Sequence, residues 1–140
     1  MYGLILALLT LLFFFRIAGQ ALVAFSGVAW LPAMEEWYSG LIPYPMLVVI
    51  QVAMLLIMIK ICVDICRVSG FFAIHRPSWS PYLIGFSALY AIAMALRYIL
   101  TMFYRPGMRW YGGTIPIVFH FVLAGFLFVL GRYHAWADKR

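Results

Sequence analysis

Charged side chains are scarce in this sequence. Of its 140 residues, 10% are Asp, Glu, Lys or Arg, whereas 67% are hydrophobic, and the mean hydropathy is +1.04. Ordinary soluble domains carry about 25% charged residues, so the composition excludes a soluble globular domain and indicates an integral membrane protein. Once each apolar run is assigned about 20 residues, no room remains for a separate soluble domain.

Cysteines and catalytic motifs are also scarce. Cys62 and Cys66 are the only cysteines, which excludes a disulfide framework. Asp64 and His75 lie near them, but the set lacks the four-ligand spacing of a structural zinc site, so we predict no metal site. The sequence also lacks a Ser-His-Asp set, a glycine-rich phosphate loop and paired carboxylates within an apolar run, and therefore shows no complete catalytic set.

Four apolar runs are long enough to cross a bilayer as helices. We predict spans at about residues 4–30, 44–66, 81–104 and 112–131, so that residues 1–140 form one all-α, polytopic four-helix bundle. No basic segment precedes the first run, which continues past Arg16. We therefore expect a retained span there rather than a cleaved signal peptide.

The basic residues outside the spans are unevenly distributed. An even number of spans puts both termini on one side, together with Lys60, Arg67, Arg76, Arg132, Lys139 and Arg140. The other side combines Arg105 and Arg109 with Glu35 and Glu36, and its aromatic residues, Trp37 among them, are expected in an interfacial belt. The positive-inside rule predicts cytoplasmic termini in a bacterial-type inner membrane. The net charge of +6 thus reflects topology and does not indicate nucleic-acid binding.

Each predicted span contains a polar residue at a similar depth. With a rise of 1.5 Å per residue, these residues lie roughly 10–15 Å from the outer ends of the spans, with Arg16 about one turn deeper. The third span contains a stripe with an alternating three- and four-residue step, which therefore lies on one face of the helix: Ser87, Tyr90, Met94, Arg97 and Thr101. We predict an outward-facing polar pocket formed by Arg16, Gln20, Gln51, Arg97 and His120.

Each of these residues also has a purely structural interpretation. A glutamine in a span often serves only as an interhelical hydrogen-bond partner, and a lone histidine is often a satisfied core residue. The aliphatic part of the Arg97 side chain is long enough for its guanidinium to snorkel toward the membrane interface. Arg16 is too deep for this, and a guanidinium near the bilayer centre costs roughly 2.5–3.5 kcal/mol or more. We therefore expect Arg16 to have a functional or essential buried role.

The two arginines require a counter-charge, and the spans offer no acidic residue at that depth. One solution is that Glu35 or Glu36 folds down from the outer connector and pairs with Arg16 or Arg97. The other is an external group, for which a quinone carbonyl, a lipid headgroup or the carboxylate of a partner protein are all suitable.

The order of features resembles the DoxX family of small four-helix membrane proteins. The resemblance lies in Arg16 followed by Gly19 in the first span, a proline-containing segment at residues 41–45 before the second, and His120 in the last. Relatives in that family include subunits of quinone-linked membrane redox enzymes and maturation factors. The resemblance implies an accessory or quinone-proximal role by analogy.

We therefore predict a subunit or accessory factor of a larger membrane complex, in contact with membrane lipids and with partner membrane proteins or further copies of itself. The alternative is a membrane enzyme or carrier that binds a quinone or a lipid through Arg16 and Arg97. In that case His120 would exchange protons, because its unperturbed pKa suits proton exchange near neutral pH.

Overall fold

Four long helices make up most of the chain. The computed structural model describes residues 1–37, 42–105 and 114–136, without the side chains of residues 35, 36 and 114. The long helices are α1 (Tyr2–Ser26), α3 (Tyr44–Arg67), α4 (Ser80–Tyr104) and α5 (Thr114–Ala135). All four are long and apolar enough to cross a membrane. No strand occurs in the described residues, and the prediction of an all-α, four-helix protein is confirmed.

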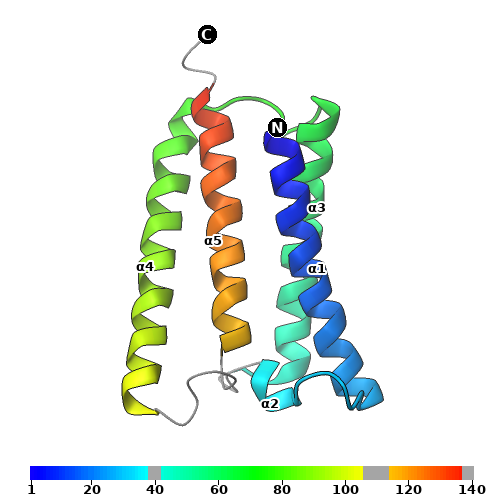
Figure 1. The fold of residues 1–140 in the computed structure, drawn as a ribbon. Coiled ribbons are helices and arrows are strands. Elements are labelled where there is room, and N and C mark those ends of the chain that lie inside the picture. The colour runs from blue at the N-terminus through cyan, green and yellow to red at the C-terminus, as the bar shows by residue number, and fades with distance from the viewer. Residues whose placement is uncertain (38–41, 106–113, 137–140) are drawn as a thin grey trace.

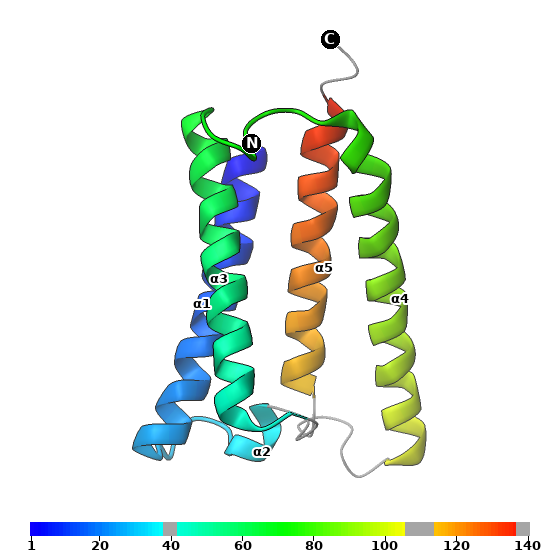
Figure 2. The same cartoon turned by 180° about the vertical axis from the view of Figure 1, so that it is seen from behind.

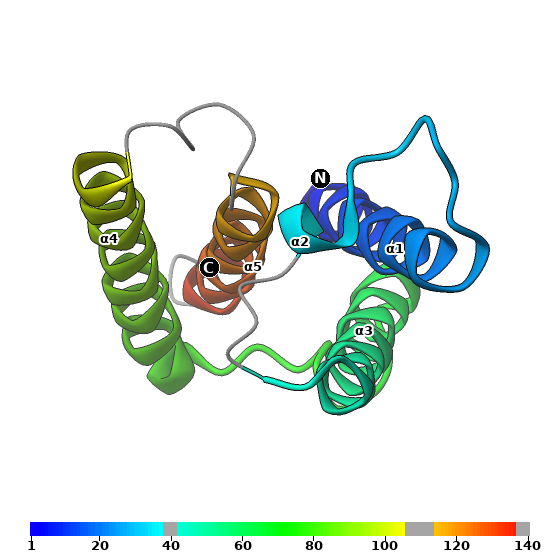
Figure 3. The ribbon, with the colours of Figure 1, turned by 90° about the horizontal axis from the view of Figure 1, so that it is seen from below.

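The helices alternate in direction and are arranged as an open arc. α1 begins and α5 ends at the same end of the bundle, which we call the terminal end, opposite the distal end (Figure 1). α4 packs on α5, α5 on α1, and α1 on α3. Within the described residues, the backbone of α3 does not closely approach α4 or α5. α5 is therefore seen between α3 and α4 from behind (Figure 2), and the arc is open on that side (Figure 3).

Two helices end at positions that differ from the predicted spans. α1 stops at Ser26 rather than near residue 30, because Gly27 adopts a left-handed conformation (φ 55°) and its N–H bonds to the carbonyl of Val23. Glycine tolerates this conformation, which is typical of a helix C-terminus. α5 continues past residue 131 to Ala135, because Tyr133 and His134 are buried at its terminal end.

The apolar core lies between α1, α3 and α5, where Leu6, Phe13, Met58 and Phe126 are buried. α4 is attached at the edge of the arc and buries only Ser80 and Ser87. Ser87 Oγ donates to the carbonyl of Ala124 on α5 at 2.7 Å. Small polar residues at such interfaces allow close helix packing in membranes.

The connector between α3 and α4 is held against the terminal end of α5. The hydroxyl of Tyr133 donates to the carbonyl of Ala73 at 2.7 Å, and the backbone N–H of Arg76 donates to Nδ1 of His134 at 3.2 Å. A short 3-10 helix, η1 (Pro77–Trp79), then leads into α4. These bonds make the connector part of the folded structure.

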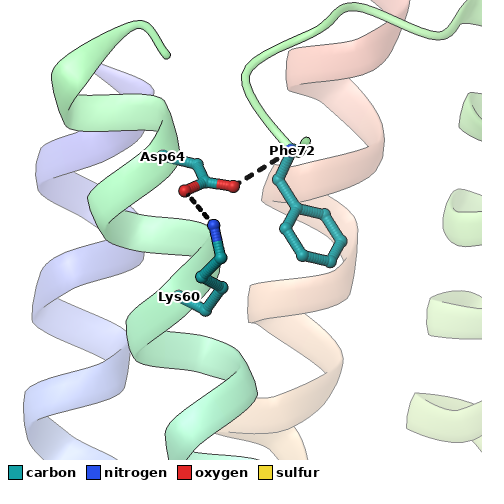
Figure 4. Close-up of polar contacts among 3 residues, drawn as sticks. All are labelled: Lys60, Asp64 and Phe72. Atoms are coloured by element: carbon teal, nitrogen blue, oxygen red, sulfur yellow. Dashed lines mark hydrogen bonds and ion pairs between the residues drawn. The ribbon is translucent and has the colours of Figure 1, made fainter. Parts of the chain in front are cut away.

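Asp64 fixes the beginning of the same connector. Its carboxylate accepts bonds from the Lys60 ammonium at 2.5 Å and from the backbone N–H of Phe72 at 3.2 Å (Figure 4). Its backbone carbonyl accepts from the N–H of Ser69 at 3.0 Å. Asp64 therefore stabilises the terminal end of α3, and both of its carboxylate oxygens are hydrogen-bonded there.

Candidate functional site

A cavity of about 290 Å³ lies between α3 and α4 and is bounded by α1 and α5 on its inner side. It is in the distal half of the bundle, because its α3 residues lie in the first half of that helix and its α5 residues in the first half of theirs. All four long helices contribute to its wall. The lining residues are Phe13, Arg16, Ile42, Leu47, Ile50, Gln51, Met54, Tyr90, Arg97, Pro116, Phe119, His120 and Leu123.

The structure brings together the five residues that were predicted to form a polar pocket. Arg16, Gln51, Arg97 and His120 line the cavity. Gln20 lies directly behind the wall, where its Oε1 accepts a bond of 3.3 Å from Nε2 of Gln51. Each predicted span thus contributes at least one polar group to one site, as their common depth indicated.

Arg16 is buried in the floor of the cavity, with 7% of its surface exposed. Its Nη2 donates to the backbone carbonyl of Trp37 at 3.1 Å, and its guanidinium lies 5.6 Å from the ring centre of Phe119. Its Nε is buried without a hydrogen-bond partner among the described residues. A guanidinium has five donors in a planar fork, so Arg16 retains unused capacity for an acceptor.

Trp37 connects the segment between α1 and α3 to the floor of the site. It is the last residue of α2 (Met34–Trp37), a short helix that packs on α1 and α5. The prediction that Trp37 belongs to an interfacial aromatic belt is wrong, since it is only 7% exposed. Its ring rests on Gly19, where a Cβ atom would lie 2.6 Å from the ring edge, and its Nε1 donates to the carbonyl of Pro32 at 2.9 Å. Gly19 makes this burial feasible because it has no side chain.

Tyr90 and His120 form a polar pair on the wall formed by α4 and α5. The hydroxyl of Tyr90 is hydrogen-bonded to Nδ1 of His120, and the rings meet edge to face with their centres 5.5 Å apart. Arg97 lies two turns from Tyr90 on the same face of α4, and both line the cavity. The three- and four-residue spacing of polar residues in this helix was the signal for this face, but it did not indicate that Tyr90 would bond to His120.

The described part of the lining contains two guanidinium groups and no carboxylate. Asp64 is not available, because it is bonded to Lys60 and Phe72 at the terminal end. The prediction that Glu35 or Glu36 neutralises Arg16 or Arg97 concerns side chains outside the described part of the chain. Among the residues that are described, neither arginine has an acidic partner within ion-pair distance.

The cysteines lie away from this cavity. Cys62 is buried against Thr10, with 3.2 Å between Sγ and Oγ1, whereas Cys66 is exposed. Across the described residues, no three His, Cys, Asp or Glu side chains are grouped closely enough to hold a metal ion. Cys62 therefore contributes to the packing of α3 on α1, and neither thiol lines the cavity.

Comparison of this chain with protein-family models, with curated proteins and with solved structures found no match. The resemblance to the DoxX family stays a prediction, and the function has to be argued from the cavity itself.

Proposed function

We propose that this protein binds an amphiphilic membrane molecule, a lipid or a quinone, in the cavity between α3 and α4. One observation carries the proposal: a cavity within four membrane-length helices combines Arg16, Gln51, Tyr90, Arg97 and His120 with apolar residues in the rest of its lining. Ligand sites are typically apolar cavities with a few converging polar groups. Ionisable residues inside a membrane usually mark a functional site.

The position of the cavity favours an occupant that comes from the bilayer. Its two sides are α3 and α4, which do not pack on each other within the described residues. Residues of these two helices that are close in sequence to the lining residues are apolar and more than half exposed: Met46, Val49, Leu89 and Leu96. An amphiphile would place its polar group near Arg16 and His120 and its chain along Ile50 and Leu123. Because the described lining offers no complete catalytic set, we propose binding rather than a reaction.

Retention of a bound amphiphile tests this function. The protein is extracted in a mild detergent, and bound molecules are identified by native mass spectrometry. We expect the wild type to retain an amphiphile and Leu123→Trp, which fills the cavity, to lose it while remaining folded. Leu89→Trp is the matched control, because Leu89 lies on α4 outside the lining and is 66% exposed. A wild type without an amphiphile, or equal retention by Leu123→Trp, would contradict the proposal.

The second candidate function is that of a subunit or accessory factor of a larger membrane complex. It is favoured by α4, which packs on α5 alone among the long helices and buries only two serines. A partner helix would cover its outer face. Leu89→Ala with Leu96→Ala should then release a co-purifying membrane protein, whereas Val49→Ala on α3 should not. A protein that is monodisperse and stable alone argues against this candidate.

We also propose that the chain lies in a bacterial-type inner membrane with its termini in the cytoplasm. Support comes from the described basic residues of the terminal end, which are Lys60, Arg67, Arg76 and Arg132. The distal end has Arg105 among its described residues. On this topology the cavity lies in the outer half of the membrane.

A further inference from the structure

The charge of the cavity lining is unbalanced, and the imbalance constrains what can occupy it. Arg16 on α1 and Arg97 on α4 both line the cavity, and no carboxylate does so among the described residues. Arginine remains protonated under all ordinary conditions. Two guanidinium groups without a carboxylate partner among the described residues are costly where they are shielded from water, and an anion placed between them would remove that cost.

The hydrogen-bonding groups of the lining point to the same class of occupant. Arg16 Nε is buried without a described partner, whereas Nη2 donates to the Trp37 carbonyl. When the Tyr90 hydroxyl donates to Nδ1 of His120, the remaining ring proton is on Nε2, which is then a donor as well. Planar guanidinium groups bind carboxylate and phosphate oxygens through two parallel bonds. The site therefore has an excess of donors for an acceptor-rich group.

We propose that the occupant of this cavity has an anionic headgroup, a phosphate or a carboxylate, bound between Arg16 and Arg97. Its apolar chain contacts Ile50, Met54 and Leu123. This inference rests on the proposed function and specifies it, because it separates anionic amphiphiles from neutral quinones and zwitterionic lipids.

Binding to the delipidated full-length protein in detergent tests the inference. The probes are dioctanoyl phosphatidylglycerol, decanoate, dioctanoyl phosphatidylcholine, a decyl-substituted benzoquinone and glycerol phosphate. We expect phosphatidylglycerol to bind about tenfold more tightly than phosphatidylcholine with the same chains. Both headgroups contain a phosphate, but Arg16 and Arg97 repel the quaternary ammonium of choline, whereas phosphatidylglycerol carries a net negative charge. Arg97→Met should remove this preference and Arg16→Met should lower the affinity. Arg132→Met, an exposed arginine at the terminal end, is the matched control and should leave both unchanged.

The outcomes separate this inference from the proposed function. Equal binding of phosphatidylglycerol and phosphatidylcholine, or binding of the benzoquinone alone, would overturn the anionic headgroup and leave the amphiphile site in place. Equally tight binding of glycerol phosphate would support the anion site and overturn the amphiphile. Binding of no probe would overturn both. If Glu35 or Glu36 supplies the counter-charge, the anion preference should appear only after both are changed to Gln, which would also overturn the inference.

Discussion

At the scale of single residues, several polar side chains of the bundle make a hydrogen bond within the protein and also line the cavity. Gln51 bonds to Gln20, as expected for an interhelical hydrogen bond, and it also lines the cavity. Gln20 is fully buried, and its Nε2 has no partner among the described residues. His120 likewise bonds to Tyr90 and faces the cavity. The structural and functional interpretations of these residues therefore do not exclude each other.

The bond between Gln20 and Gln51 gives a prediction at this scale. Gln20→Leu leaves the Gln51 amide without its acceptor. Changing both residues to Leu removes both polar groups, so the double variant should lose little more unfolding free energy than Gln20→Leu alone. In a double-mutant cycle we expect a coupling energy of about 0.6 kcal/mol, the average for such bonds in membranes. The measurement is the free energy of unfolding in mixed detergent micelles. Additive single effects would show that the bond contributes nothing to stability.

At the scale of elements, the short helix α2 connects the segment between α1 and α3 to the floor of the site. Trp37 contributes its carbonyl to Arg16 and its ring to the surface above Gly19. Pro32, earlier in the same connector, accepts the indole N–H. The position of α2 and the orientation of Arg16 therefore depend on each other.

A methyl group at Gly19 should disturb this arrangement. In Gly19→Ala the new Cβ would lie 2.6 Å from the Trp37 ring, so the ring must move and the bond from Arg16 to the Trp37 carbonyl weakens. Overpacking of this kind costs about 1–3 kcal/mol. Thermal unfolding in detergent should show the loss. Gly85→Ala on α4 is the control: nothing lies within 4 Å of its added Cβ, so stability should be unchanged or higher. An unaltered Tm in Gly19→Ala would refute the packing of Trp37 on this glycine.

At the scale of the whole molecule, the bundle has two different ends and one open side. The terminal end is closed by the α3–α4 connector, which is bonded to α5 and to Asp64. The side between α3 and α4 contains the cavity. The core lies in α1, α3 and α5, which leaves α4 with most of its apolar side chains exposed.

The proposed topology predicts opposite accessibility of the two ends. Single cysteines at Ala33 in the connector that holds α2 and at Ser78 in η1 are introduced into a protein without Cys62 and Cys66; both positions are exposed. In intact cells, a membrane-impermeant maleimide should label Ala33→Cys and leave Ser78→Cys unlabelled until the membrane is opened. Labelling of both positions from outside would refute the four-span topology, and the reverse pattern would refute cytoplasmic termini.

The sequence alone determined the helices and the depth of the polar residues. The length of an apolar run decides whether it can cross a membrane, and the rise of 1.5 Å per residue fixes the depth of every side chain along it. Gln51, Arg97 and His120 could therefore be assigned to one level, and Arg16 to a level about one turn deeper, before their neighbours were known. The structure places all four around one cavity. The helical period likewise predicted that Tyr90 and Arg97 share a face.

Which helices are neighbours, and which polar groups meet, depends on how the four helices pack together. Hydropathy and helical period describe each span separately, and they do not fix the angular order of four helices joined by connectors. The open side between α3 and α4, the bond of Tyr90 to His120, and the engagement of Asp64 by Lys60 and Phe72 all depend on that order. The burial of Trp37 was not predictable either, because an aromatic residue in a connector is usually interfacial. It is buried because a glycine on another helix leaves space for its ring.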